Sequence, residues 1–275
     1  MKLRQKSMLL MFFMMLMSMN VMAQSSSYVS TLKEYLTLTQ SSNLDTEKMK
    51  KTLQALNQSK YSQLTLAQSE KLIDEYLSSQ YEADVYEKVL APIFQKHASE
   101  EDLKKQIAVL TTPEGKLYTE HLNAASAGVG LMLGMSVLTL LTDDDGSGDE
   151  TPEEECSQSY RDLFNKYYDA SRIEQMLSGV MNTLVSNMKD RVDDQKILEK
   201  LSKGMQHNLK KYSLTCFVEI MTEDDMKFGL KMFEDPAAKH IQDASLEMSG
   251  NIVQLALSSV NCYTEWLQSK GISAQ

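Results

Sequence analysis

The chain has 275 residues, with 28 Lys or Arg against 38 Asp or Glu, so its formal net charge is −10. An acidic surface repels nucleic acid and anionic lipid headgroups, which argues against a nucleic-acid-binding role. Only four prolines interrupt long stretches rich in Leu, Met, Lys, Glu and Gln, and this composition predicts an all-α fold.

Residues 1–23 have the pattern of a secretory signal peptide. Three basic residues precede an apolar segment from Met8 to Met17, and Ala23 ends a group of residues suited to cleavage. An uncleaved anchor is the alternative, but the apolar segment is short for a membrane span. Cleavage leaves 25 Lys and Arg against 38 Asp and Glu, a net charge of −13. We therefore expect an exported protein of the periplasm or cell envelope of a Gram-negative bacterium.

Apolar residues at helical spacing predict the helices that follow. In the first part of the mature chain these helices are expected at residues 28–40, 45–56, 66–79 and 83–97. In the second part, similar patterns are expected at residues 160–168, 173–188 and 207–220.

One stretch of the sequence occurs twice. Residues 94–126 and 217–249 align without a gap at a constant offset of 123 residues, with seven identical positions. Each copy predicts a helix, a sharp corner and a second helix. The earlier helices of the two parts align at a different offset, so loop insertions separate them.

Both copies carry the same signals for helix ends. A hydroxyl residue at the N-cap accepts a hydrogen bond from the first turn, and a carboxylate three residues later can complete a capping box. A proline then occupies the first position of the next helix, where no N–H group is needed. These residues are Ser99, Asp102 and Pro113 in the first copy and Thr222, Asp225 and Pro236 in the second.

These motifs resemble the bacterial domain of unknown function 2059. The first copy carries the fuller pattern, SEEDL at 99–103 and PEG at 113–115, whereas the second has Ala238 where the first has Gly115. The resemblance implies a helical envelope protein and supplies no catalytic residues.

The predicted architecture is two tandem copies of a helical unit, each with its own core. Repeat one covers 24–142, an acidic linker covers 143–155, repeat two covers 156–267, and a disordered tail covers 268–275. Like charges with Gly, Ser and Pro discourage helix formation in the linker.

Residues 122–142 contain no charged side chain and are long enough to cross a bilayer. The aligned helix of the second copy contains the charged residue Glu247, which argues against a membrane span at 122–142. We therefore expect 122–142 to form a buried helix whose exposed side also holds repeat two or a partner. Membrane association through 122–142 is the alternative.

All three cysteines, Cys156, Cys216 and Cys262, lie in the second part. In an oxidising compartment we expect a Cys156–Cys262 disulfide that ties the ends of repeat two together, with Cys216 as a buried free thiol. A nucleophilic or metal-binding thiol is the alternative, but no CxxC or neighbouring His motif supports it.

No catalytic, cofactor-binding or metal-ligating motif stands out, so we predict no such residues. The expected function is a non-catalytic envelope protein that binds a protein or an apolar ligand. Stripes of Met and Tyr favour helix packing over a ligand groove. An envelope hydrolase with an unrecognised site and a membrane-associated protein are the alternatives.

Overall fold

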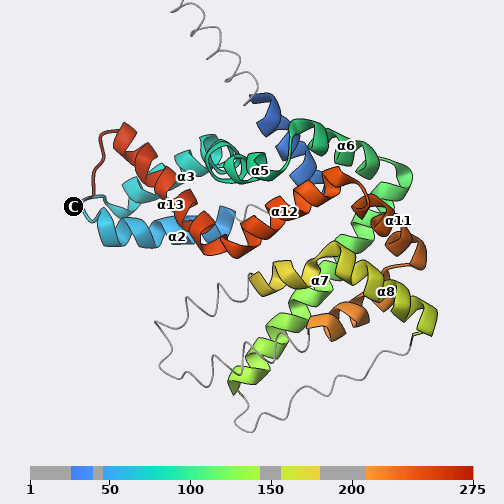
Figure 1. The fold of residues 1–275 in the computed structure, drawn as a ribbon. Helices are drawn as coiled ribbons and strands as arrows, with labels where there is room; N and C mark the ends of the chain where they lie inside the picture. Colours follow the sequence, from blue (N-terminus) through green and yellow to red (C-terminus); the bar gives the residue numbers. More distant parts are fainter. Residues whose placement is uncertain (1–25, 40–45, 143–155, 180–208, 275) are drawn as a thin grey trace, which may run out of the picture.

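The computed structural model describes residues 26–39, 46–142, 156–179 and 209–274 (Figure 1). Every regular element within these ranges is a helix, which confirms the all-α class. The predicted signal peptide at 1–23 and the predicted linker at 143–155 lie outside the described residues.

The described part of the first half, residues 26–142, follows the predicted helices closely. Its first helix covers residues 26–38. It continues with α2 (Thr46–Lys60), α3 (Leu66–Ser79), α4 (Tyr81–Asp84), the π-helical segment η1 (Val85–Leu90), α5 (Ala91–His97), α6 (Glu100–Leu110) and α7 (Pro113–Thr142).

The described part of the second half, residues 156–274, begins with α8 (Gln158–Ser171). Short helical stretches follow at residues 173–179 and 209–220. The half ends with α11 (Glu223–Phe233), α12 (Pro236–Gly250) and α13 (Ile252–Ser269).

Both predicted capping boxes are present. The N–H group of Asp102 donates to Ser99 Oγ at 3.1 Å, and the N–H group of Ser99 donates to Asp102 Oδ2 at 2.9 Å. The corresponding distances between Thr222 and Asp225 are 3.1 and 2.8 Å. These reciprocal bonds satisfy donors that the first helical turn otherwise leaves free, and they set where α6 and α11 begin.

The two predicted corners are also confirmed. α7 begins at Pro113, and Thr112 Oγ1 accepts a hydrogen bond from the N–H group of Gly115 at 3.0 Å. α12 begins at Pro236, and Asp235 Oδ1 accepts from the N–H group of Ala237 at 2.8 Å. The corner at Gly115 is the tighter one, because an added Cβ atom there would meet the backbone oxygen of Val109.

The helix expected at 83–97 contains a π-helical segment that the sequence analysis missed. The N–H group of Ala91 donates to the carbonyl oxygen of Tyr86, five residues earlier. Pro92 follows directly, and a proline inside a helix lacks a donor and clashes with the carbonyl group four residues before it. Widening the preceding turn accommodates this ring without ending the helix.

The apolar core corrects the prediction that each unit has its own core. The helix after each proline packs against the opposite half. α7 contributes Ala125, Val129 and Leu133 to a cluster formed with α8, residues 209–221 and α11. Conversely, α12 contributes Ile241 and Ala244 to a cluster formed with residues 28–36, α5 and α6.

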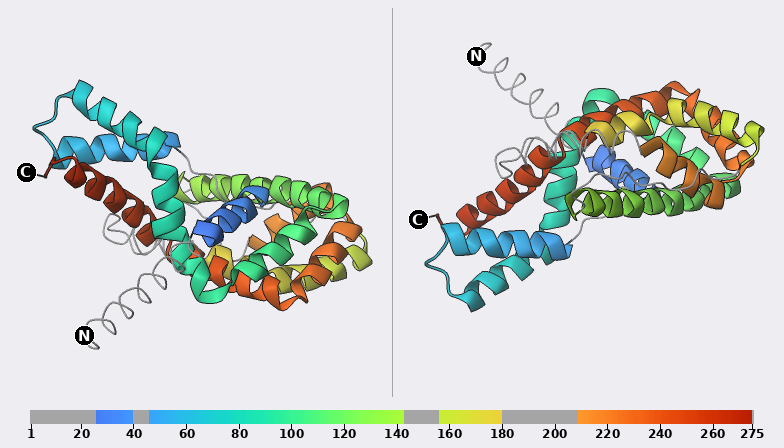
Figure 2. Two further views of the ribbon diagram at one scale, coloured as in Figure 1. Left: turned by 90° about the horizontal axis from the view of Figure 1, so that it is seen from above. Right: turned by 90° about the horizontal axis from the view of Figure 1, so that it is seen from below.

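A third cluster also combines the two halves. α2, α3, α4 and η1 pack around Cys262, Tyr263 and Leu267 of α13. Figure 2 shows α2, α3 and α13 together at one end of the molecule, away from α7, α8 and α11. The described helices therefore form one body in which each half completes the cores of the other.

The chain end was predicted as a disordered tail from residue 268, and the structure corrects this for residues 268–274. α13 continues to Ser269, and Gly271 takes a left-handed conformation with φ of 77°. The N–H group of Ile272 donates to the carbonyl oxygen of Leu267 at 3.0 Å, and the Ile272 side chain packs against the third cluster. This is a Schellman-type helix end, which ties the following residues to the helix.

Histidine–carboxylate and lysine–carboxylate contacts also join the halves where α7 and α12 pack against the opposite half. His121 of α7 lies 2.8 Å from the Asp225 carboxylate, and His240 of α12 lies 3.1 Å from the Asp102 carboxylate. Each capping-box carboxylate is thus also bonded by a histidine from the opposite half. Lys96 and His97 of α5 bind Glu247 of α12 and lower the pKa of its carboxyl.

Asp225 should stabilise the fold in a pH-dependent way. Burial opposes ionisation of Asp225, but hydrogen bonds from Thr222 and His121 outweigh it and lower the pKa of the carboxyl. Its stabilisation is therefore present above the pKa of the unfolded chain, about 3.9, and is lost as the pH falls through the lower folded value. We expect Asp225→Ala to reduce the free energy of unfolding by about 1.5–3 kcal/mol near neutral pH, with a smaller loss below about pH 4.

Urea unfolding across this pH range measures the effect. Asp224→Ala is the matched control, because the Asp224 side chain is in the same turn but is 95% exposed. That control should change stability by less than about 0.5 kcal/mol. An Asp225→Ala loss that is the same at acidic and neutral pH would contradict the assigned role.

Candidate functional site

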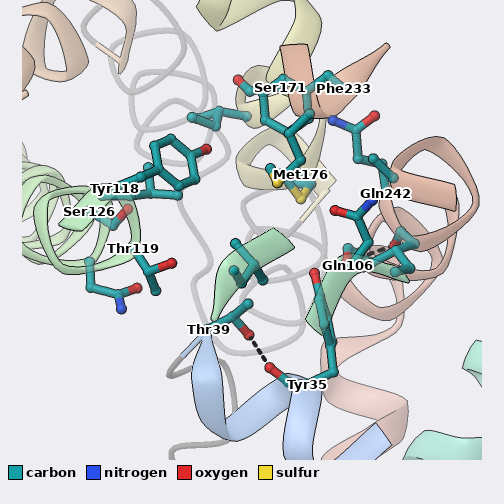
Figure 3. A pocket seen from close by; sticks show the side chains of 18 of the residues that line it. Tyr35, Thr39, Gln106, Tyr118, Thr119, Ser126, Ser171, Met176, Phe233 and Gln242 are labelled. Carbon is teal, nitrogen blue, oxygen red and sulfur yellow. Dashed lines mark hydrogen bonds between the residues drawn. The ribbon is translucent and has the colours of Figure 1, made fainter. Parts of the chain in front are cut away.

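A cavity of the described residues lies where the two halves meet. Its volume is about 410 Å³, within the range of cavities that bind small molecules. We call it the central cavity. It is lined by residues of the first helix, α6, α7, α8, the stretch at 173–179, α11 and α12 (Figure 3). The uncharged polar residues among them are Thr39, Gln106, Thr119, Asn123, Ser126, Ser171, Gln242 and Ser245.

The cavity is lined by both of the helices that pack against the opposite half, α7 and α12. Several lining residues occupy equivalent places in the two copies, at the offset of 123 residues. These pairs are Leu110 with Phe233, Tyr118 with Ile241, Thr119 with Gln242, and Leu122 with Ser245. Figure 3 shows Tyr118, Thr119 and Ser126 on one side of the space and Gln106 and Gln242 on the other. Both halves therefore line the cavity.

The lining carries no charged side chain among the described residues, and its tyrosines stay neutral. The hydroxyl groups of Tyr118 and Tyr167 lie 2.7 Å apart and share a hydrogen bond. Burial raises the pKa of Tyr118 well above its usual value, and the neighbouring Tyr167 raises it further. Burial also raises the pKa of Tyr35 to about 12. This environment disfavours ionised ligands and provides no activated tyrosine for chemistry.

A glycine on α11 makes room for the tyrosine pair. A Cβ atom at Gly229 would clash with Cε2 of Tyr167 and lie 3.0 Å from Cε2 of Tyr118. Both rings are almost fully buried, so relieving this clash would require them to shift from their packed positions. The absence of a side chain at Gly229 therefore lets both rings pack against the backbone of α11 and form one wall of the cavity.

Two amide donors in the lining lack a partner. Nε2 of Gln106 and Nδ2 of Asn123 are buried and donate no hydrogen bond to any described residue. The whole Gln106 side chain is buried, with the residue only 3% exposed. An unpaired buried donor costs about 1–3 kcal/mol, so these groups favour a bound molecule that brings acceptor oxygen atoms.

The cysteines do not form the expected site. All three are free, and the predicted Cys156–Cys262 disulfide is not formed. That prediction assumed that the ends of the second half meet, whereas Cys262 packs with α2 and α3 of the first half. Cys156 precedes α8, whose buried residues belong to a different cluster. Burial raises the pKa of the Cys216 and Cys262 thiols, which makes both poor nucleophiles.

The described residues offer neither a metal-ion site nor a membrane-spanning helix. Across the described ranges, no three His, Cys, Asp or Glu side chains come together in a way that could hold a metal ion. None of the described helices combines the length and apolar character needed to cross a bilayer. The helix that includes 122–142 buries one face, but Leu131 and Met135 on another face are 71% and 70% exposed.

The predicted structural residues hold the site in place but do not line it. The starts of α6, α7, α11 and α12 are set by Ser99, Pro113, Thr222 and Pro236, respectively. Sequence analysis missed the lining residues themselves. One signal was available, because Gln106 lies between Leu103 and Leu110 at core spacing, and it is more buried than Ile107.

No protein-family model, curated protein or solved structure matches the chain. The resemblance to the domain of unknown function 2059 therefore stays a prediction.

Gly229 provides a direct test of the tyrosine wall. We expect Gly229→Ala to reduce the free energy of unfolding by about 1–3 kcal/mol, because the new methyl group overpacks two buried rings. Gly130→Ala is the control, since a Cβ atom there meets nothing within 4 Å. It should gain up to about 1 kcal/mol from helix propensity. Urea unfolding measures both, and equal effects would contradict the close packing.

Proposed function

We propose that the chain is a non-catalytic binding protein of the cell envelope that holds a largely apolar, uncharged ligand in the central cavity. The observation that carries this proposal is the cavity with its two unpaired amide donors, Gln106 Nε2 and Asn123 Nδ2. Apolar and aromatic walls with a few oriented polar groups are typical of small-molecule sites. The basic and apolar segments at residues 1–23 support export.

The proposed architecture is two tandem copies of a helical unit that exchange the helix after the proline. The support is the repeated capping box, the repeated proline corner and the reciprocal packing of α7 and α12. Exchange of an identical element between copies is an established route to paired structures. In this proposal duplication produced the binding site, because residues from equivalent positions face each other across it.

Dye binding to a cavity-filling variant tests the proposal. The neutral dye N-phenylnaphthylamine, whose fluorescence rises in apolar surroundings, should bind the purified protein. Ser126 lies on α7 and lines the central cavity, so Ser126→Phe places a ring inside it. We expect the dye affinity to fall at least about ten-fold, equivalent to about 1.4 kcal/mol.

The matched control is Ala124→Phe, on the same helix. Residues two positions apart point to nearly opposite sides of a helix, and Ala124 is exposed and does not line the central cavity. Its dye affinity should match that of the unmodified protein. Absence of dye binding in the unmodified protein, or an equal loss in both variants, would overturn the proposal.

A further inference from the structure

Three cavities follow one another along α7. The mouth cavity, about 350 Å³, is lined by Leu38, Leu110, Lys116, Thr119, Glu120 and Asn123. It shares three of these residues, Leu110, Thr119 and Asn123, with the central cavity. The distal cavity, about 250 Å³, includes Val129, Gly130, Leu133 and Phe217 in its lining. It shares Ser126, Ile173 and Met176 with the central cavity, so the three spaces adjoin.

One face of α7 lines this whole series. Six of its lining residues recur at alternating intervals of three and four positions, which places them in one line along a helix. They are Lys116, Thr119, Asn123, Ser126, Gly130 and Leu133. The line begins with a charged residue, continues with uncharged polar residues and ends with apolar ones. The series therefore has one polar end and one apolar end.

The dimensions fit a single chain. The ten residue-to-residue steps from Asn123 to Leu133 span about 15 Å along a helix axis. The hydrocarbon core of a bilayer is about 30 Å thick and contains two layers of acyl chains, so one chain extends over about half of that length. The path from the unpaired amide of Asn123 to the end of the distal cavity thus matches one membrane-type acyl chain.

We propose that the ligand is a single long acyl chain with an uncharged carbonyl group at its head, as in a monoacyl ester or the protonated form of a fatty acid. Its head accepts hydrogen bonds from Gln106 Nε2 and Asn123 Nδ2, which have no other acceptor in the described part of the chain. Its tail follows α7 between Ile173 and Met176 into the distal cavity. This inference rests on the proposed function and names the ligand class of the same site.

Chain length provides the test of the tail. Octanoate and palmitate are titrated against the dye-loaded protein, and monopalmitoylglycerol serves as the ester arm. Each methylene that becomes buried should raise the affinity by up to about four-fold, so palmitate should displace the dye at far lower concentration than octanoate. The ester shares the tail and the carbonyl group of palmitate but cannot ionise, so the uncharged lining predicts that the ester binds at least as tightly as palmitate.

Gly130→Leu shortens the proposed path. An added Cβ atom at Gly130 meets nothing within 4 Å, and the residue lines the distal cavity only. The variant should therefore fold, with an unchanged or higher melting temperature, and should lose at least about ten-fold in palmitate affinity. Octanoate affinity should change less than about two-fold, since its tail ends before this residue.

Gln106→Leu tests the head. Removing an unpaired buried donor should raise the melting temperature of the free protein, while palmitate affinity should fall by about ten-fold and dye affinity should fall less. A parallel rise in melting temperature and loss of palmitate binding is not expected from a purely structural glutamine.

The failures of the two proposals are distinguishable. Dye binding that persists without any dependence on acyl chain length would overturn the acyl-chain inference and leave the binding function intact. Equal losses for octanoate and palmitate in Gly130→Leu would also overturn it. Absence of dye binding in the unmodified protein would overturn both.

Discussion

The structure depends on the exchange of two helices between its halves. α7 and α12 each begin at a proline, and each leaves its own half to complete the core of the other. Either half without its partner would expose the apolar faces that this exchange covers, at about 25 cal/mol for each Å² of apolar surface. The capped corners matter because they set the direction in which each helix leaves. The histidine contacts to the two capping-box carboxylates join the corners of one half to the helix of the other.

The central cavity is a consequence of this exchange. Because α7 and α12 each pack against the opposite half, equivalent positions of the two copies line one cavity, but the side chains at those positions differ. Tyr118 corresponds to Ile241, and the large Gln106 occupies the place that Gly229 holds in the second copy. Such differences prevent the halves from filling the space between them symmetrically. The buried amides that remain unpaired lower stability, as polar groups retained at a functional site commonly do.

Local features of this fold could be predicted from the sequence, because they depend on neighbouring residues. The capping boxes at Ser99 and Thr222, the corners at Pro113 and Pro236, and the bounds of α3 all follow from short-range hydrogen bonding and helical periodicity. The π-helical segment was missed, although Pro92 was visible in the sequence. A periodic apolar pattern alone predicted a regular helix there.

Long-range features could not be predicted in the same way. Periodicity shows that a helix has an apolar face, but it does not show which helix covers that face. The assumption that each unit has its own core therefore failed, and the proposed Cys156–Cys262 bond failed with it. The site residues were missed for a related reason, since Gln106 of the first half and Gln242 of the second half line one cavity only because the halves pack together.

Cleavage between the halves tests most directly whether α7 and α12 each pack into the core of the opposite half. A specific protease site inserted within 143–155 would allow the peptide bond between the halves to be cut in the folded protein. The account predicts that the two fragments stay together during gel filtration under native conditions and keep the helical circular dichroism of the intact protein. Fragments that separate into two independently folded pieces would contradict it.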